Sequence, residues 1–68
     1  PNPTTGDLNI TLENNSLVSL YDMHGRLIKT KNSNTKLLNW NIFDLENGIY
    51  ILTIETNGKT SSQKIVKK

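Results

Sequence analysis

Apolar and polar residues alternate with a period of two along most of this chain. The pattern is clearest in residues 8–12, where leucine and isoleucine alternate with asparagine and threonine, and in residues 38–42, where Leu38, Trp40 and Ile42 alternate with asparagine. A strand that buries one face has this period, because successive side chains point to opposite faces. The pattern therefore predicts half-buried strands over residues 8–12 and 38–42.

The sequence predicts four further strands, over residues 17–21, 26–29, 49–56 and 60–67. In the first of them Val18 and Leu20 lie on one face, and Leu17 and Tyr21 lie on the other. The segment 49–56 is the strongest candidate, because both of its faces carry apolar side chains. The final segment has only Ile65 and Val66 as large apolar residues, so it is the most polar of the predicted strands.

Turn signals separate these segments. In Asp22–Gly25 the aspartate can accept amides of its own chain and the glycine tolerates a positive φ, which predicts a hairpin between the flanking strands. Asn57-Gly58 is the preferred dipeptide of a type I′ hairpin. We also expect a loop over Thr30–Thr35, a bend at Asp44 and a turn over Glu46–Gly48.

The first seven residues differ from the rest of the chain. Pro1 and Pro3 have no amide donor and Gly6 frees the backbone, so this stretch neither starts a helix nor enters a central strand. We expect residues 1–7 to form an extended amino-terminal segment with a turn.

Composition narrows the fold class. The 68 residues suffice for one domain, and they include ten asparagines, eight threonines and no alanine. The absence of alanine, the strongest helix former, argues against helices, and threonine favours strands. Short strands at a spacing of about 8–12 residues are typical of an antiparallel β-sandwich or barrel. The chain is therefore predicted to be all-β, with the strand order left open.

The sequence offers little catalytic chemistry. With no cysteine and a single histidine, His24, it can form neither a disulfide nor a thiolate zinc site. Asp22 and His24 share a turn, but a metal ion needs three or four ligands. There is no Gly-x-Ser-x-Gly motif and no phosphate-binding glycine loop. We expect no catalytic residues, no cofactor and no metal.

Charge argues against nucleic-acid binding, and hydropathy argues against a membrane-spanning segment. The formal net charge is only +2, and no aromatic residues interleave the carboxyl-terminal lysines, so nucleic-acid binding is not expected. No run approaches the roughly 20 apolar residues of a membrane span, and no amino-terminal signal peptide is visible.

Two features each admit two interpretations. Trp40 shares a strand face with Leu38 and Ile42, which favours core packing over a sugar-stacking platform. The lysines near the carboxyl end either protect an edge strand from aggregation or attract an acidic receptor. They are Lys59, Lys64, Lys67 and Lys68.

Four motifs occur in order along the chain. They are Pro1-Asn2-Pro3-Thr4-Thr5-Gly6, Val18-x-Leu20-Tyr21-Asp22-x-x-Gly25-Arg26, Leu45-x-x-Gly48-Ile49-Tyr50-Ile51-Leu52 and Lys64-Ile65-Val66-Lys67. Together they resemble the type A C-terminal sorting domain of the type IX (Por) secretion system, over essentially the whole chain. The sequence departs from that family at Asn47, where a proline often stands, although asparagine also suits turns.

The resemblance implies a single domain over residues 1–68, folded as a small immunoglobulin-like antiparallel β-sandwich of six to seven strands. The residues that match its fold motifs are Pro3, Gly6, Gly25, Leu45, Gly48 and Tyr50. Tyr50 would form a tyrosine corner, in which the hydroxyl group bonds to nearby backbone.

The resemblance also implies a function. Such a domain is a non-catalytic sorting signal at the end of a larger cargo protein, which reaches the periplasm by its own signal. The outer-membrane translocon recognises the domain, a sortase-like protease usually removes it, and the cargo is secreted or held at the cell surface. The terminal segment Lys64, Ile65, Val66 and Lys67 would contact the translocon. The main alternative is an immunoglobulin-like adhesive or carbohydrate-binding module that stays on the mature protein. A third possibility is a structural spacer, which would show no ligand and no processing.

Overall fold

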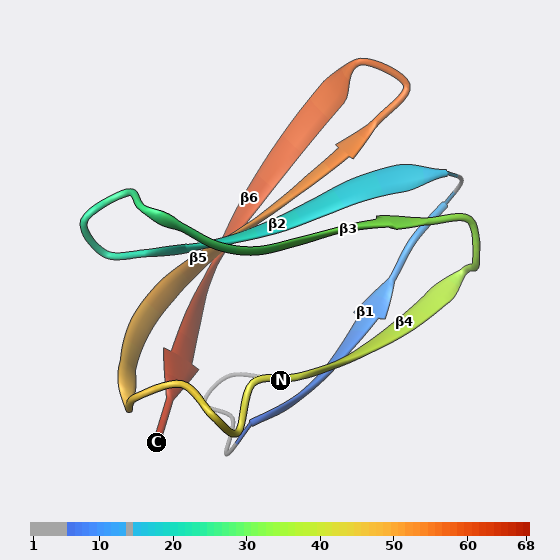
Figure 1. Cartoon of the computed structure of the whole chain (residues 1–68). Coiled ribbons are helices and arrows are strands. Elements are labelled where there is room, and N and C mark those ends of the chain that lie inside the picture. Colours follow the sequence, from blue (N-terminus) through green and yellow to red (C-terminus); the bar gives the residue numbers. More distant parts are fainter. Residues whose placement is uncertain (1–5, 14) are drawn as a thin grey trace.

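The computed structural model describes residues 6–13 and 15–68 of the chain, which form six strands (Figure 1). The strands are β1 (Asp7–Thr11), β2 (Ser16–Asp22), β3 (Leu27–Ser33), β4 (Leu37–Asn41), β5 (Gly48–Thr56) and β6 (Lys59–Lys67). No helix occurs among the described residues. Every predicted strand is present, and apart from β3 each begins and ends within one residue of its predicted bounds.

The strands form two antiparallel sheets. A two-stranded sheet pairs β1 with β4, and a four-stranded sheet has the order β3-β2-β5-β6. The small sheet lies against one face of the large one (Figure 1). The expected all-β fold is confirmed, and the arrangement is that of a small immunoglobulin-like β-sandwich.

The core lies between the two sheets and follows the alternation in the sequence. The small sheet and the residues beside it supply every second side chain, and the large sheet supplies the facing set. The buried apolar residues are Leu8, Ile10, Leu12, Val18, Leu20, Leu38, Ile42, Tyr50, Leu52 and Ile65. Trp40, Leu45 and Ile54 are partly buried against this cluster, so the prediction that Trp40 packs on the core is confirmed.

The two predicted hairpins are present. β5 and β6 are joined by Asn57 and Gly58 with φ values of +53° and +78°, and two successive positive φ angles define the type I′ turn. In the other hairpin, the Gly25 N–H donates to the Asp22 carbonyl at 3.0 Å, and Gly25 has φ +84°. Turn chemistry read from the sequence thus set both connections.

The loop predicted over Thr30–Thr35 is wrong in its first part, since residues 30–33 continue β3 to Ser33. They pair with β2 in register from Ser19↔Thr30 to Ser16↔Ser33. An edge strand needs only backbone pairing on one side, so polar side chains can occupy it while they face water. Lack of an apolar pattern therefore concealed residues 30–33, which are four of the seven residues of β3.

A bulge also interrupts the ladder between β2 and β3. Leu20 pairs with Lys29 and Tyr21 pairs with Leu27, which leaves Ile28 as an extra residue. Lys29 reaches across to the other sheet, where its Nζ lies 3.1 Å from the Asn41 carbonyl and 3.6 Å from Asp44.

Of the extended amino-terminal segment expected over residues 1–7, residues 1–5 lie outside the described residues. Asp7 already belongs to β1, where it pairs with Asn41. The bend expected at Asp44 is present, because the Leu45 N–H donates to the Ile42 carbonyl at 3.1 Å across a turn.

Candidate functional site

The terminal segment Lys64–Lys67 lies in β6, at an edge of the four-stranded sheet. Its side chains alternate between two environments. Ile65 and Lys67 face the core and are only 3% and 7% exposed, whereas Lys64 is exposed and Val66 is half-buried on the outer face. Only Lys64 and Val66 therefore offer their side chains to a partner that approaches the outer face of the sheet.

Lys67 has a structural contact that the sequence did not reveal. Its Nζ donates to the Asn47 side-chain oxygen at 3.3 Å, and the residue pairs with Gly48 in the ladder. An ammonium group is costly to bury unless it is hydrogen-bonded. The contact joins the end of β6 to the loop before β5, so Lys67 contributes to the fold whatever else it does.

Tyr50 makes the hydrogen bond expected of a tyrosine corner. Its hydroxyl donates to the Glu46 carbonyl at 2.5 Å, while the ring is buried in the core. Leu45, on the same loop, packs against the core cluster, and β5 begins at Gly48. The hydrogen bond thereby fixes the loop that crosses from the small sheet to the large one to the hydroxyl group of Tyr50.

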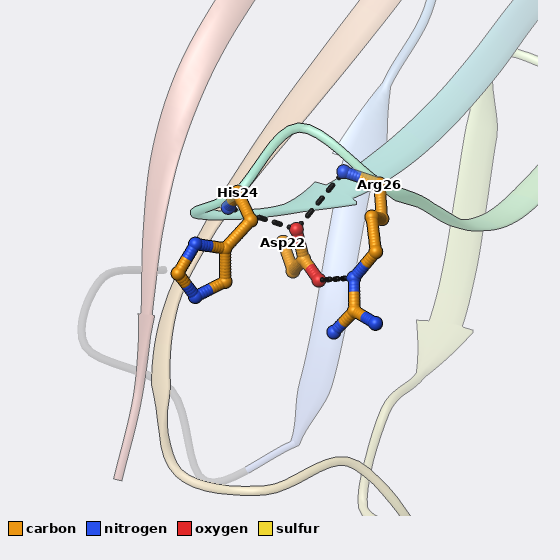
Figure 2. Close-up of polar contacts among 3 residues, drawn as sticks. All are labelled: Asp22, His24 and Arg26. Atoms are coloured by element: carbon orange, nitrogen blue, oxygen red, sulfur yellow. Dashed lines mark hydrogen bonds and ion pairs between the residues drawn. The ribbon is translucent and has the colours of Figure 1, made fainter.

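The turn between β2 and β3 is organised by one carboxylate (Figure 2). Asp22 Oδ1 accepts the backbone N–H groups of His24 and Arg26, each at 2.9 Å, and Oδ2 accepts Arg26 Nε at 2.8 Å. The bond from the Arg26 backbone is the largest of the influences that lower the pKa of Asp22 below its ordinary value. His24 contributes its main-chain N–H to this network, and its imidazole takes no part in the bonds drawn.

Gly6 lies where the chain enters the sandwich. It is buried with φ +140°, and its carbonyl accepts the Ile42 N–H at 2.7 Å. A Cβ atom at this position would collide with the ring of Phe43, whose Cε1 would be 2.8 Å away. Glycine therefore fits both the backbone angle and the contact. Pro3, another residue of the fold motifs, lies outside the described residues.

The described residues contain no group of three or more His, Cys, Asp or Glu side chains that could hold a metal ion. Every buried side-chain nitrogen or oxygen atom in the described part of the chain has a hydrogen-bond partner. No helix in residues 6–13 or 15–68 is long and apolar enough to span a membrane.

These features are those of a small β-sandwich domain with a terminal edge strand, in which polar side chains form hydrogen bonds within turns and between strands. The whole chain, residues 1–68, matches the model of the secretion system C-terminal sorting domain, and the chain belongs to that family. The resemblance to type IX sorting domains is thereby confirmed. A comparison with curated proteins gave no match.

Membership of this family has direct consequences. The domain is a C-terminal signal for type IX secretion, which implies an upstream cargo to which it is fused. It also implies that this cargo is secreted or carried to the cell surface. Sorting domains of this kind are generally non-catalytic.

Proposed function

We propose that the domain is a non-catalytic sorting signal. The outer-membrane translocon binds the folded domain, and β6 forms part of the contact. The cargo arrives through the periplasm, and a sortase-like protease removes the domain after transfer. The observation that carries the proposal is the position of β6. The strand lies at a sheet edge, its inward residues Ile65 and Lys67 fix it to the core, and Lys64 and Val66 remain on the outer face.

The burial pattern of β6 explains how a receptor can recognise this strand. A receptor that binds a flexible tail must order the tail, which costs conformational entropy. Here nine residues of β6 pair with β5, and the two buried side chains fix which face points outward. The outward side chains are therefore already in position before a partner arrives.

The test places the 68 residues at the carboxyl end of a periplasmic reporter in a strain that has the type IX system. We expect the reporter outside the cell, with a mass that shows loss of the domain. In a strain without the translocon, it should remain in the periplasm. Reporter retained in the periplasm of the competent strain would contradict the proposal.

The same assay separates the proposed function from the alternative of a retained adhesive or carbohydrate-binding module. A retained module would appear on the exported reporter at full mass and would bind glycan when isolated. Trp40, the residue that suggested sugar stacking, is instead packed partly against the core. We therefore expect neither property.

Deletion of Ile65 to Lys68 is a poor test of recognition, because it also removes two side chains that face the core. Lys64→Glu is sharper, since the side chain of Lys64 is exposed. Its matched control is Lys31→Glu, an exposed lysine on β3 at the opposite edge of the same sheet. We expect export to fall for Lys64→Glu and to persist for Lys31→Glu. Equal export of both variants would remove Lys64 from the contact.

A further inference from the structure

The outer face of the four-stranded sheet is arranged in rows that run across the strands. Leu27, Tyr21, Ile51 and Lys64 are directly paired, one from each strand, and Ile49 and Val66 are paired beside them. We call these six residues together the apolar row, with Lys64 as its one charged member. A different set, Thr30, Ser19, Thr53 and Ser62, forms the next row toward the β5–β6 turn.

The two rows have different chemistry on the same face. The second row consists entirely of hydroxyl side chains, and Ser19 and Thr30 approach each other at 3.3 Å. The apolar row, in contrast, has Leu27 55% exposed and Ile49 38% exposed. Apolar residues are therefore more numerous at this end of the face, although Leu17, which is 37% exposed, lies at the other end.

The fold itself does not use this end of the face. The small sheet and the buried cluster lie on the other side of the large sheet, with Leu20 and Leu52 pointing toward them. Tyr21 and Ile51 are the next residues along the same strands and therefore point away. Apolar side chains gathered on an outer face indicate a surface that contacts another molecule.

Charge at this end indicates what that molecule presents. Lys64 belongs to the apolar row, and the alternation of β6 continues through Val66 to the exposed Lys68. The carboxylate on the face, Glu55, is in the row farthest from it, paired with Leu17 and Thr60.

The acidic residues of the neighbouring turns change this picture little. The carboxylate of Asp22 is bonded to Arg26, and that of Asp44 lies 3.6 Å from Lys29. Glu46 is the other carboxylate on these turns, and Lys64 and Lys68 add positive charge at this end of the face. A complementary partner would place carboxylates there, because like charges across an interface are unfavourable.

We propose that the apolar row is a docking surface, and that its partner is a protein of the secretion machinery that presents an apolar strip flanked by carboxylates. This inference rests on the proposed function and extends it from the terminal strand to all four strands of the sheet. Leu27 is decisive, because it lies on β3, the edge strand farthest from β6.

The structure provides a matched pair of leucines for the test. Leu27 is 55% exposed on the large sheet, and Leu37 is 61% exposed on β4 of the small sheet. Leu27→Asp and Leu37→Asp add the same charge at similar exposure, on opposite sheets. We expect Leu27→Asp to lower export of the reporter about tenfold, and Leu37→Asp to leave it unchanged. Circular dichroism of both purified variants checks that each remains folded.

Leu27→Lys tests the chemistry of the partner. Against flanking carboxylates, lysine should retain several-fold more export than aspartate at the same position. Equal loss with both substitutions would contradict an acidic partner and leave only an apolar contact. Equal export of Leu27→Asp and Leu37→Asp would overturn the proposal.

Two further outcomes separate this inference from its premise and from another occupant. Failure of the unsubstituted domain to export the reporter would contradict the proposed function itself. If the purified domain dimerises in sedimentation and Leu27→Asp abolishes the dimer without affecting export, the row binds a second copy and the inference is wrong.

Discussion

The β5–β6 hairpin has two halves that share one ladder but differ in almost every other respect. Near the carboxyl terminus, the paired residues Tyr50 and Ile65 are buried and form part of the core. Toward the turn, β6 is exposed at every residue from Lys59 to Lys64. Backbone pairing is continuous through both halves, so the ladder alone does not decide where stability lies. We expect the packing of the buried side chains against the small sheet to decide it.

The largest effect should come from removing a core side chain in the buried half. Ile65 is 3% exposed within the core cluster, and replacing such a side chain by alanine (Ile65→Ala) costs about 2–5 kcal/mol of the free energy of unfolding. Gln63→Ala, on the same face of β6 but exposed, should cost much less. Urea unfolding of both variants measures the difference. Similar losses would contradict the contrast between the two halves.

A smaller effect should follow from the tyrosine corner. Tyr50→Phe keeps the buried ring and removes the hydrogen bond to the Glu46 carbonyl, with an expected loss of about 1 kcal/mol. Tyr21→Phe is the control, because the Tyr21 hydroxyl forms no hydrogen bond with the described residues. Thermal melts of both variants check the prediction, and an unchanged midpoint for Tyr50→Phe would refute it.

The smallest effect should come from the exposed turn at Asp22, outside the hairpin. Its pKa is lower in the folded state than its ordinary value of 3.8, so the carboxylate stabilises the fold above that pH. The contribution is lost as the pH falls through the folded-state pKa. Asp22→Asn should therefore lose less stability than the parent between pH 6 and pH 3. Parallel urea series at the two pH values test this, and identical losses would contradict it.

Local chemistry explains what the sequence could predict. The turns at Asp22–Gly25 and Asn57-Gly58 depend on residues next to one another, and the alternating leucines and isoleucines define the faces of β1 and β4. The hydrogen bond of Tyr50 spans only four residues. Features of this kind can be read from a short window of sequence.

Other features depend on partners far away in the sequence. Residues 30–33 are polar, and only their pairing with β2 makes them a strand. Lys67 is buried, and the acceptor of its hydrogen bond, Asn47, lies twenty residues earlier. The apolar row needs the order β3-β2-β5-β6, which no local pattern supplies. The sequence thus located the terminal segment but could not show which of its side chains face outward.

The apolar row forms only after all four strands of the large sheet have paired. Of these four strands, β6 comes last along the chain. A chain whose synthesis or folding stops before β6 docks would lack Lys64 and Val66 on that surface. A receptor that binds the row would accordingly reject unfinished molecules. The same contact that selects the cargo would then also verify the conformation of the domain.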